Sequence, residues 1–290
     1  MTAQLIINGI SLGAVYALIA VGFAIIFNIL KFSNFAHGGF MTVTAYVGFL
    51  ATRFWHTSLL WTLLIASLAG GMLGIIAELV AFRRIRNNKG PVIYYFVSSI
   101  TLGMLLENLM TIFFSTNFYA YPNFFPVATV KVGQLLLGVP ELIMFCISSL
   151  ALIILAVLIY RTKLGTALRS VSYDVDTSGL MGINVLRIIQ LAFFLAGFLG
   201  GISGVFLGIS YTLYPQLGQL VVKGFVASVI GGLGSLSGAV IGAFLLGIIE
   251  ILLIRLVGSG ISPVFIFVIM LLFLLVRPRG IAGSHIQEKA

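Results

Sequence analysis

The chain has 290 residues, of which 60% are hydrophobic and only 8% are charged, and its formal net charge is +9. With a mean hydropathy of +1.19 and repeated apolar runs of membrane-spanning length, it has too little polar surface to cover a water-soluble globule. Composition therefore predicts an all-α, polytopic membrane helical bundle and excludes the soluble classes of protein.

Particular stretches of the sequence argue against four other interpretations. A transmembrane β-barrel would alternate apolar and polar residues, whereas residues 142–160 are apolar on every face. The basic residues lie beside hydrophobic segments, as at the cytoplasmic ends of membrane helices, so we expect no nucleic-acid partner. The single cysteine, Cys146, excludes an internal disulfide. No Lys or Arg precedes Lys31, so we expect no cleaved signal peptide.

Hydropathy divides the chain into a series of apolar segments that belong to one transmembrane domain, residues 1–290. We expect about eight or nine transmembrane or re-entrant segments. Residues 35–51 and 220–232 are short and rich in small residues, which is typical of half-helices or re-entrant segments. The apolar segments are 5–30, 35–51, 59–82, 92–114, 142–160, 188–209, 220–232, 236–256 and 263–276.

Positive charge indicates the orientation. Residues 83–89 ("RRIRNNK"), 161–187 and 277–279 ("RPR") together hold ten of the sixteen Lys and Arg residues, so we place all three in the cytoplasm. An odd number of crossings then puts the N-terminus outside. If the seventh segment is re-entrant, the termini share a side or another boundary moves. Residues 115–141 would be external, and "VATVKVGQLLL" within them could form a short hairpin.

Small residues interrupt the apolar pattern in two ways. The run "GFLGGISGVFLG" places glycines four residues apart, which favours close helix packing. The polar breaks "KFSNFAHGGF" (Lys31–Phe40) and "GGLGSLSGAVIG" (Gly231–Gly242) each precede a helix rich in small residues. Paired breaks can mark the pathway of a transporter with an internal repeat. The first break is equally explained by a tight turn in which Ser33 or Asn34 caps a helix from Phe35.

The sequence lacks the motifs of an enzyme. It has no H-E-x-x-H, no G-x-S-x-G and no cysteine pair for a metal, so we predict neither catalysis nor a metal site. No Gly-Lys dipeptide occurs, which excludes the G-x-x-x-x-G-K-[ST] phosphate-binding loop. Any use of ATP must therefore take place on another chain.

Ionisable residues inside apolar segments leave two interpretations open. Glu107 and Glu250 would be costly in lipid unless they face a cavity or a partner, so they could form a proton relay. They could equally hydrogen-bond within the bundle or lie nearer helix ends. Glu78, about a turn from Arg83 and Arg84, is expected at the membrane interface.

The order of four stretches resembles bacterial ABC-importer permeases of the branched-chain amino acid type. They are "SLGAVYALIAVGFAIIFNILKFSNFAHGGFM" (residues 11–41), "LGTALRSVSYDVDTSGLMGINVLRI" (164–188), "GGLGSLSGAVIGA" (231–243) and "RPRGIAG" (277–283), so the resemblance covers nearly the whole chain. The chain departs from that family at Asp176, Thr177 and Ser178, where members often have Glu-Ala-Ala-like residues.

This resemblance implies a permease subunit of an ATP-driven importer in the bacterial inner (plasma) membrane. It implies four kinds of partner: a second permease subunit, two ATPase subunits that carry ATP and Mg²⁺, an external solute-binding protein and a small-molecule substrate. The substrate would be a branched-chain or other apolar amino acid, with urea or short amides as an alternative. Residues 161–187 would be the cytoplasmic coupling loop, with a short helix from Asp174 to Leu180. Its expected ATPase-coupling residues are Asp174, Asp176, Thr177, Ser178, Gly179, Leu180 and Gly182.

Residues that could line the substrate path follow from the two polar breaks. We expect Asn34, His37 and Gly38 on one side and Ser235 and Gly238 opposite. A proton-coupled secondary carrier, which would need Glu107 or Glu250 to move protons, is the rival from another class. A passive channel of the aquaporin kind is disfavoured, because the paired Asn-Pro-Ala motifs are absent.

Overall fold

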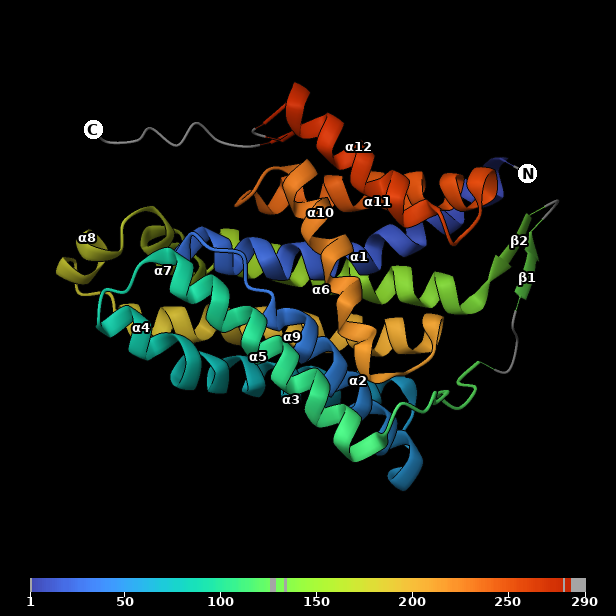
Figure 1. The fold of residues 1–290 in the computed structure, drawn as a ribbon, viewed down its shortest axis with the longest axis horizontal. Coiled ribbons are helices and arrows are strands. Elements are labelled where there is room, and N and C mark those ends of the chain that lie inside the picture. The colour runs from blue at the N-terminus through green and yellow to red at the C-terminus, as the bar shows by residue number, and fades with distance from the viewer. Residues whose placement is uncertain (1, 126–128, 133–134, 279, 283–290) are drawn as a thin grey trace.

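A computed structural model describes residues 2–125, 129–132, 135–278 and 280–282 of the chain. It is an all-α bundle, as the composition predicts, with one small hairpin at an end (Figure 1). The long helices follow the apolar segments to within a few residues at each end. They are α1 (Thr2–Leu30), α2 (Ala36–Trp55), α3 (Leu59–Ala77), α5 (Val92–Phe114), α6 (Val139–Arg161), α9 (Val185–Tyr211), α11 (Leu236–Val257) and α12 (Ser262–Val276).

Shorter elements join these helices. They are the π-helical turn η1 (Glu78–Phe82), α4 (Arg83–Asn87), the strands β1 (Thr129–Val132) and β2 (Leu135–Gly138), α7 (Lys163–Tyr173), α8 (Val175–Leu180), the 3₁₀ turn η2 (Pro215–Leu220) and α10 (Val221–Gly231).

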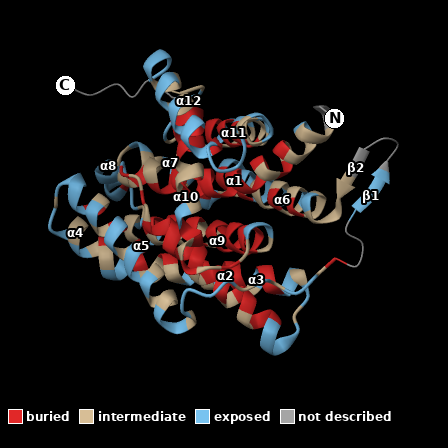
Figure 2. Cartoon of the chain, turned by 45° about the vertical axis from the view of Figure 1, so that its right-hand side comes forward, coloured by how far each residue is buried: buried red, intermediate tan, exposed pale blue. Residues whose placement is uncertain are grey.

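Six helices in the described part of the chain are long and apolar enough to cross a membrane: α1, α3 with its continuation to Asn87, α5, α6, α9 and α11. They divide into a centre and a periphery. Within the most apolar 18-residue stretch of each helix, 83% of the residues of α1 and 78% of those of α9 are buried, against 11% in α5. Figure 2 shows the same division, with the buried residues gathered on α1, α2 and α9 and the exposed ones on the outer helices. The outer apolar faces suit contact with lipid or with another membrane chain.

The basic segments 83–89 and 161–187 lie at one end of the bundle. In Figure 1, α4, α7 and α8 stand at the left, and the hairpin of β1 and β2 stands at the right. Lys31, at the end of α1, donates a hydrogen bond to the carbonyl of Ser172 in α7 (3.2 Å), which ties the turn after α1 to the 161–187 segment. By the positive-inside rule, we expect this end to be cytoplasmic. The start of α1 then lies on the external side.

The predicted hairpin is confirmed. β1 and β2 pair antiparallel, with Thr129 opposite Gly138. β2 leads directly into α6, whose second residue is Pro140, where a missing backbone N–H is harmless.

The interfacial position predicted for Glu78 is wrong. Glu78 is fully buried, and it pairs with Arg86 (2.6 Å) rather than with Arg83 or Arg84. The π-helical turn begins at Glu78, where α3 passes into α4. A buried carboxylate needs such a partner, because an isolated charge away from water is strongly unfavourable.

Close packing along α9 confirms the reading of its glycines. A Cβ built on Gly197 would collide with the carbonyl oxygen of Gly70 in α3, and one on Gly70 would collide with that of Gly197. A Cβ built on Gly201 of α9 would likewise collide with the backbone of Ala66 and Ser67 in α3. Because apolar side chains gain little from leaving lipid, backbone approach of this kind is a main source of helix association in membranes.

We expect Gly197→Ala to destabilise the protein by about 1–3 kcal/mol, since the added methyl group overpacks the contact of α3 with α9. Gly260→Ala is the matched control, because no atom lies within 4 Å of a Cβ built there. Thermal unfolding of the purified protein in detergent measures both. Equal melting temperatures for the two variants would contradict the packing argument.

Candidate functional site

The segment expected to couple to an ATPase is folded into two capped helices. The hydroxyl of Thr162 accepts a hydrogen bond from the Gly165 N–H (3.1 Å) and begins α7. The carboxylate of Asp174 accepts from the Thr177 N–H (2.9 Å) and begins α8. Side-chain acceptors at these positions satisfy backbone donors that the first turn of a helix leaves open. The helix predicted near Asp174 to Leu180 is therefore present.

Gly182 ends α8 in a Schellman motif. Its φ is +84°, the left-handed conformation that glycine adopts without strain. The Gly182 N–H bonds to the Gly179 carbonyl (3.1 Å) and the Ile183 N–H to the Ser178 carbonyl (3.1 Å). Two residues later, Asn184 caps α9 by accepting from the Arg187 N–H (3.1 Å). The connection from α8 into α9 is thus short and hydrogen-bonded throughout.

The surface of this segment is apolar where water would favour polar side chains. Leu180 is 89% exposed, and Tyr173 and Met181 are exposed to a similar degree. A groove of about 460 Å³ runs between α7 and α8. Its lining residues are Thr166, Arg169, Ser170, Tyr173, Asp174, Thr177, Ser178, Met181 and Ile183.

The first polar break forms a buried cluster in the centre of the bundle. Asn34 and His37 are both almost fully buried, and Asn34 Oδ1 accepts from the Ala36 N–H (3.2 Å), so Asn34 closes the turn before α2. No hydrogen-bond partner for either ring nitrogen of His37 is present among the described residues. The ring lies against Gly22 of α1 and Gly200 of α9. Gly38 packs against the backbone of Gly218 in η2.

The second break lies nearer the cytoplasmic end. Ser235 caps α11 by accepting from the Gly238 N–H (3.1 Å), and the backbones of Gly238 and Gly231 are in contact. The neighbouring Gly234 faces Asn28 of α1. Since the first break meets α1 at Gly22, the two breaks contact this helix about 9 Å apart along its axis.

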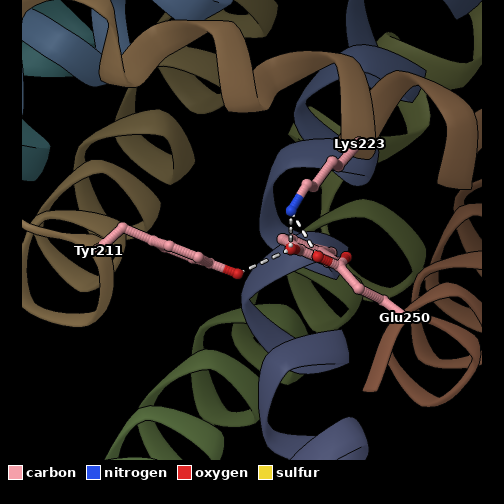
Figure 3. Close-up of polar contacts among 4 residues, drawn as sticks. Tyr211, Lys223 and Glu250 are labelled. Atoms are coloured by element: carbon pink, nitrogen blue, oxygen red, sulfur yellow. Dashed lines mark hydrogen bonds and ion pairs between the residues drawn. The ribbon is translucent and has the colours of Figure 1, made fainter. Parts of the chain in front are cut away.

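A charged cluster occupies the middle of the bundle. Lys223 of α10 donates to Glu250 of α11 (2.5 Å) and to the hydroxyl of Tyr16 in α1 (3.0 Å). The Lys223 ammonium also lies 5.4 Å from the ring centroid of Tyr211, at the end of α9. Figure 3 shows Lys223, Glu250 and Tyr211 directed toward one another. The prediction that Glu250 hydrogen-bonds within the bundle is therefore confirmed.

The cluster lies inside the membrane-spanning part of the bundle, nearer the end opposite the basic segments: Glu250 is about 10 Å from the C-terminal end of α11, and Tyr211 is the last residue of α9. Tyr16 is the midpoint of α1, and Glu250 is about 21 Å from the cytoplasmic start of α11 at 1.5 Å per residue. Glu107 lies at a similar depth, about 22 Å from the cytoplasmic start of α5. Ionisable groups at such a depth face a cavity or one another, and they commonly mark a transport pathway.

Polar side chains extend from this cluster to the molecular surface. Tyr214 lies within electrostatic reach of Lys223 in α10, Tyr211 in α9 and Glu107 in α5. Gln219 is exposed and lines the same pocket as Tyr214 and Lys223, and Asn108, which follows Glu107 in α5, is also exposed. We call this set the polar face: Glu107, Asn108, Tyr211, Tyr214, Gln219 and Lys223.

Sequence reasoning did not single out Lys223, Tyr16 or Tyr211. A lysine inside the short segment 220–232 was the available signal, because a charge there requires a partner. The two tyrosines carry no such signal, since aromatic residues are common in apolar helices.

These features define a multi-pass helical membrane protein with a charged cluster inside its membrane-spanning part, the architecture of a membrane transporter. The sequence profile of the family described as "Branched-chain amino acid transport system / permease component" matches residues 5–275. The chain belongs to this family of transport permeases. Family membership confirms the transport class, the membrane location and the absence of an enzymatic role expected from the sequence.

Curated relatives cover almost the whole chain. The high-affinity branched-chain amino acid transport system permease proteins LivH of Salmonella typhimurium and BraD of Pseudomonas aeruginosa are each 31% identical, over 99% of this chain and 97% of the relative. A probable branched-chain amino acid transport permease protein LivH of Methanocaldococcus jannaschii is 27% identical, over 92% of this chain and 88% of the relative. No solved structure gives a significant match.

We expect Lys223→Met alone to destabilise the protein by about 3–5 kcal/mol, because it leaves the buried Glu250 carboxylate unpaired. The double variant Lys223→Met/Glu250→Met removes both charges and should recover most of that loss. Thermal unfolding in detergent compares them. A double variant as unstable as the single one would show that the ion pair itself stabilises the fold.

Proposed function

We propose that this chain is the membrane-spanning permease subunit of an ATP-driven importer for branched-chain or other apolar amino acids. Family membership and the relatives named for branched-chain amino acid transport support this assignment. Permeases for urea or short amides are the alternative within the same class. The proposal rests mainly on one observation. The helix pair α7 and α8 is joined to the central helix α9 by a short connection that is hydrogen-bonded throughout.

In this proposal, the coupling segment of α7 and α8 receives movement from an ATPase. The exposed Leu180 and Met181 and the groove between the two helices offer an apolar surface for a partner protein. ATP and Mg²⁺ would be held entirely by that partner. The coupling residues would be Asp174, Asp176, Thr177, Ser178, Gly179, Leu180 and Gly182, with the first and last acting through the caps of α8.

The polar face would meet a second permease subunit and line the substrate path between the two chains. Asn108 and Gln219 are exposed at a depth where lipid would disfavour them, so a water-filled path or a protein neighbour suits them better. Asn34, His37 and Gly38 are buried in this conformation and would reach a path only after rearrangement. The same applies to Gly238, whereas Ser235 is partly exposed.

The proposed topology has nine membrane-embedded segments, with α2, α10 and α12 added to the six longest helices and the N-terminus outside. The two polar breaks support an internal repeat, because each joins a helix that reaches the cytoplasmic end to one that leaves it (Figure 1). An external solute-binding protein would deliver substrate at the opposite end, on the side of the hairpin.

A photoreactive residue placed at Leu180 in native membranes should capture an ATPase subunit, because this side chain projects from the end of α8. Lys131 in the external hairpin is the control position, since it is exposed at the opposite end of the molecule. Mass spectrometry identifies the captured chain. Capture of the ATPase from Lys131, or from neither position, would contradict the proposed coupling surface.

Uptake of leucine into proteoliposomes by the assembled importer should require ATP and should persist when the proton gradient is collapsed. Glu107→Gln should keep most of this uptake, because no proton has to pass through Glu107. A secondary carrier gives the opposite result on both measurements: uptake without ATP, and loss of uptake in Glu107→Gln.

A further inference from the structure

A pocket of about 340 Å³ opens on the Lys223 side chain, between η2, α10 and α12. Its polar members are Tyr214, Gln219 and Lys223, and its remaining walls are apolar. A mostly apolar hollow with a few convergent polar groups is the usual form of a small-molecule site. The apolar members are Leu220, Val222, Val226, Pro263, Ile266 and Phe267.

The Lys223 ammonium is poised to bind an anion in this pocket. An ammonium has three N–H donors, and in the described structure Glu250 and Tyr16 accept two hydrogen bonds from it. Its side chain is 17% exposed, whereas that of Glu250 is 4% exposed, so the cation is the accessible member of the pair. Glu250 Oε2 is buried without a hydrogen-bond partner among the described residues. The carboxylate therefore holds the ammonium in place and leaves part of it accessible from the pocket.

A purely structural role explains this arrangement poorly. Replacing a buried ion pair by apolar residues of similar volume is often neutral or stabilising, so such a pair is weak evidence for stability. Glycine contacts already hold both ends of the segment that carries Lys223. Gly218 packs on Gly38 at one end, and Gly231 packs on Gly238 at the other. Packing thus fixes the backbone of the segment that carries Lys223 without help from the ion pair.

We propose that Lys223 binds the α-carboxylate of an apolar amino acid in transit, with the aliphatic side chain against the apolar walls. Glu250 and Tyr16 are positioning residues that hold the ammonium where it faces the pocket. This inference rests on the proposed function, because it takes the substrate class from it. A single cation beside apolar walls matches a molecule with a carboxylate and a hydrocarbon body.

Substrate protection of a nearby thiol tests the proposal in the assembled importer. Gln219→Cys is introduced with Cys146→Ala, and the rate of labelling by a water-soluble thiol reagent is measured. Leucine at about ten times its Kd should slow labelling by about tenfold, because only the unoccupied pocket exposes the thiol. Isoamylamine has the same hydrocarbon body and amine without the carboxylate, so it should not protect.

Variants at the ion pair separate binding from folding. Lys223→Met/Glu250→Met, in the same background, should lose protection by leucine and ATP-dependent leucine uptake while remaining assembled with its ATPase. Lys223→Arg keeps the positive charge and should retain part of both. The proposal is overturned if the double variant keeps protection and uptake, or if isoamylamine protects as well as leucine.

Different outcomes contradict the proposed function and the role of Lys223. If the importer with Lys223 intact takes up no leucine with ATP, the proposed function is wrong, and the role of Lys223 falls with it. If that importer takes up leucine and the double variant does so equally well, only the role of Lys223 is wrong.

Discussion

Backbone contact between α9 and its neighbours is the interaction on which the rest of the structure depends. Gly197 and Gly201 bring α9 against α3, and Gly204 brings it against the carbonyl of Met41 in α2. In lipid, apolar side chains do not drive helices together as they do in water, so small residues that allow close approach largely determine which helices are neighbours. The central position of α9 follows from this glycine face.

Because of this central position, α9 adjoins α8 at its first turn and the charged cluster at its last residue. Its first turn is capped directly after the Schellman motif that ends α8, and its last residue, Tyr211, lies beside the Lys223 ammonium. In the proposed importer, a displacement of α8 would therefore be transmitted to the charged cluster through one continuous helix. Rigid elements with close-packed neighbours shift as units, because a packed interface does not deform gradually.

The sequence predicted those features that depend on local composition. Segment boundaries and the hairpin follow from hydropathy and alternation, which act over a few residues. The helix between Asp174 and Gly182 was expected from the resemblance to the permease family. It did not predict the partner of Lys223, because Glu250 and Tyr16 come from other helices and hydropathy does not report which helices touch. Glu78 was misplaced for the same reason, since charge spacing alone cannot distinguish Arg86 from its neighbours.

The first polar break and the charged cluster were separate features in the sequence, yet packing connects them. Gly38 lies against Gly218, and the Gly218 N–H donates to the hydroxyl of Thr42 (2.8 Å), so α2 holds η2 in place. η2 passes directly into α10, whose third residue is Lys223. A side chain at Gly38 would displace η2 and with it the ammonium. The glycine thus affects the site through backbone position, and the lysine affects it through charge.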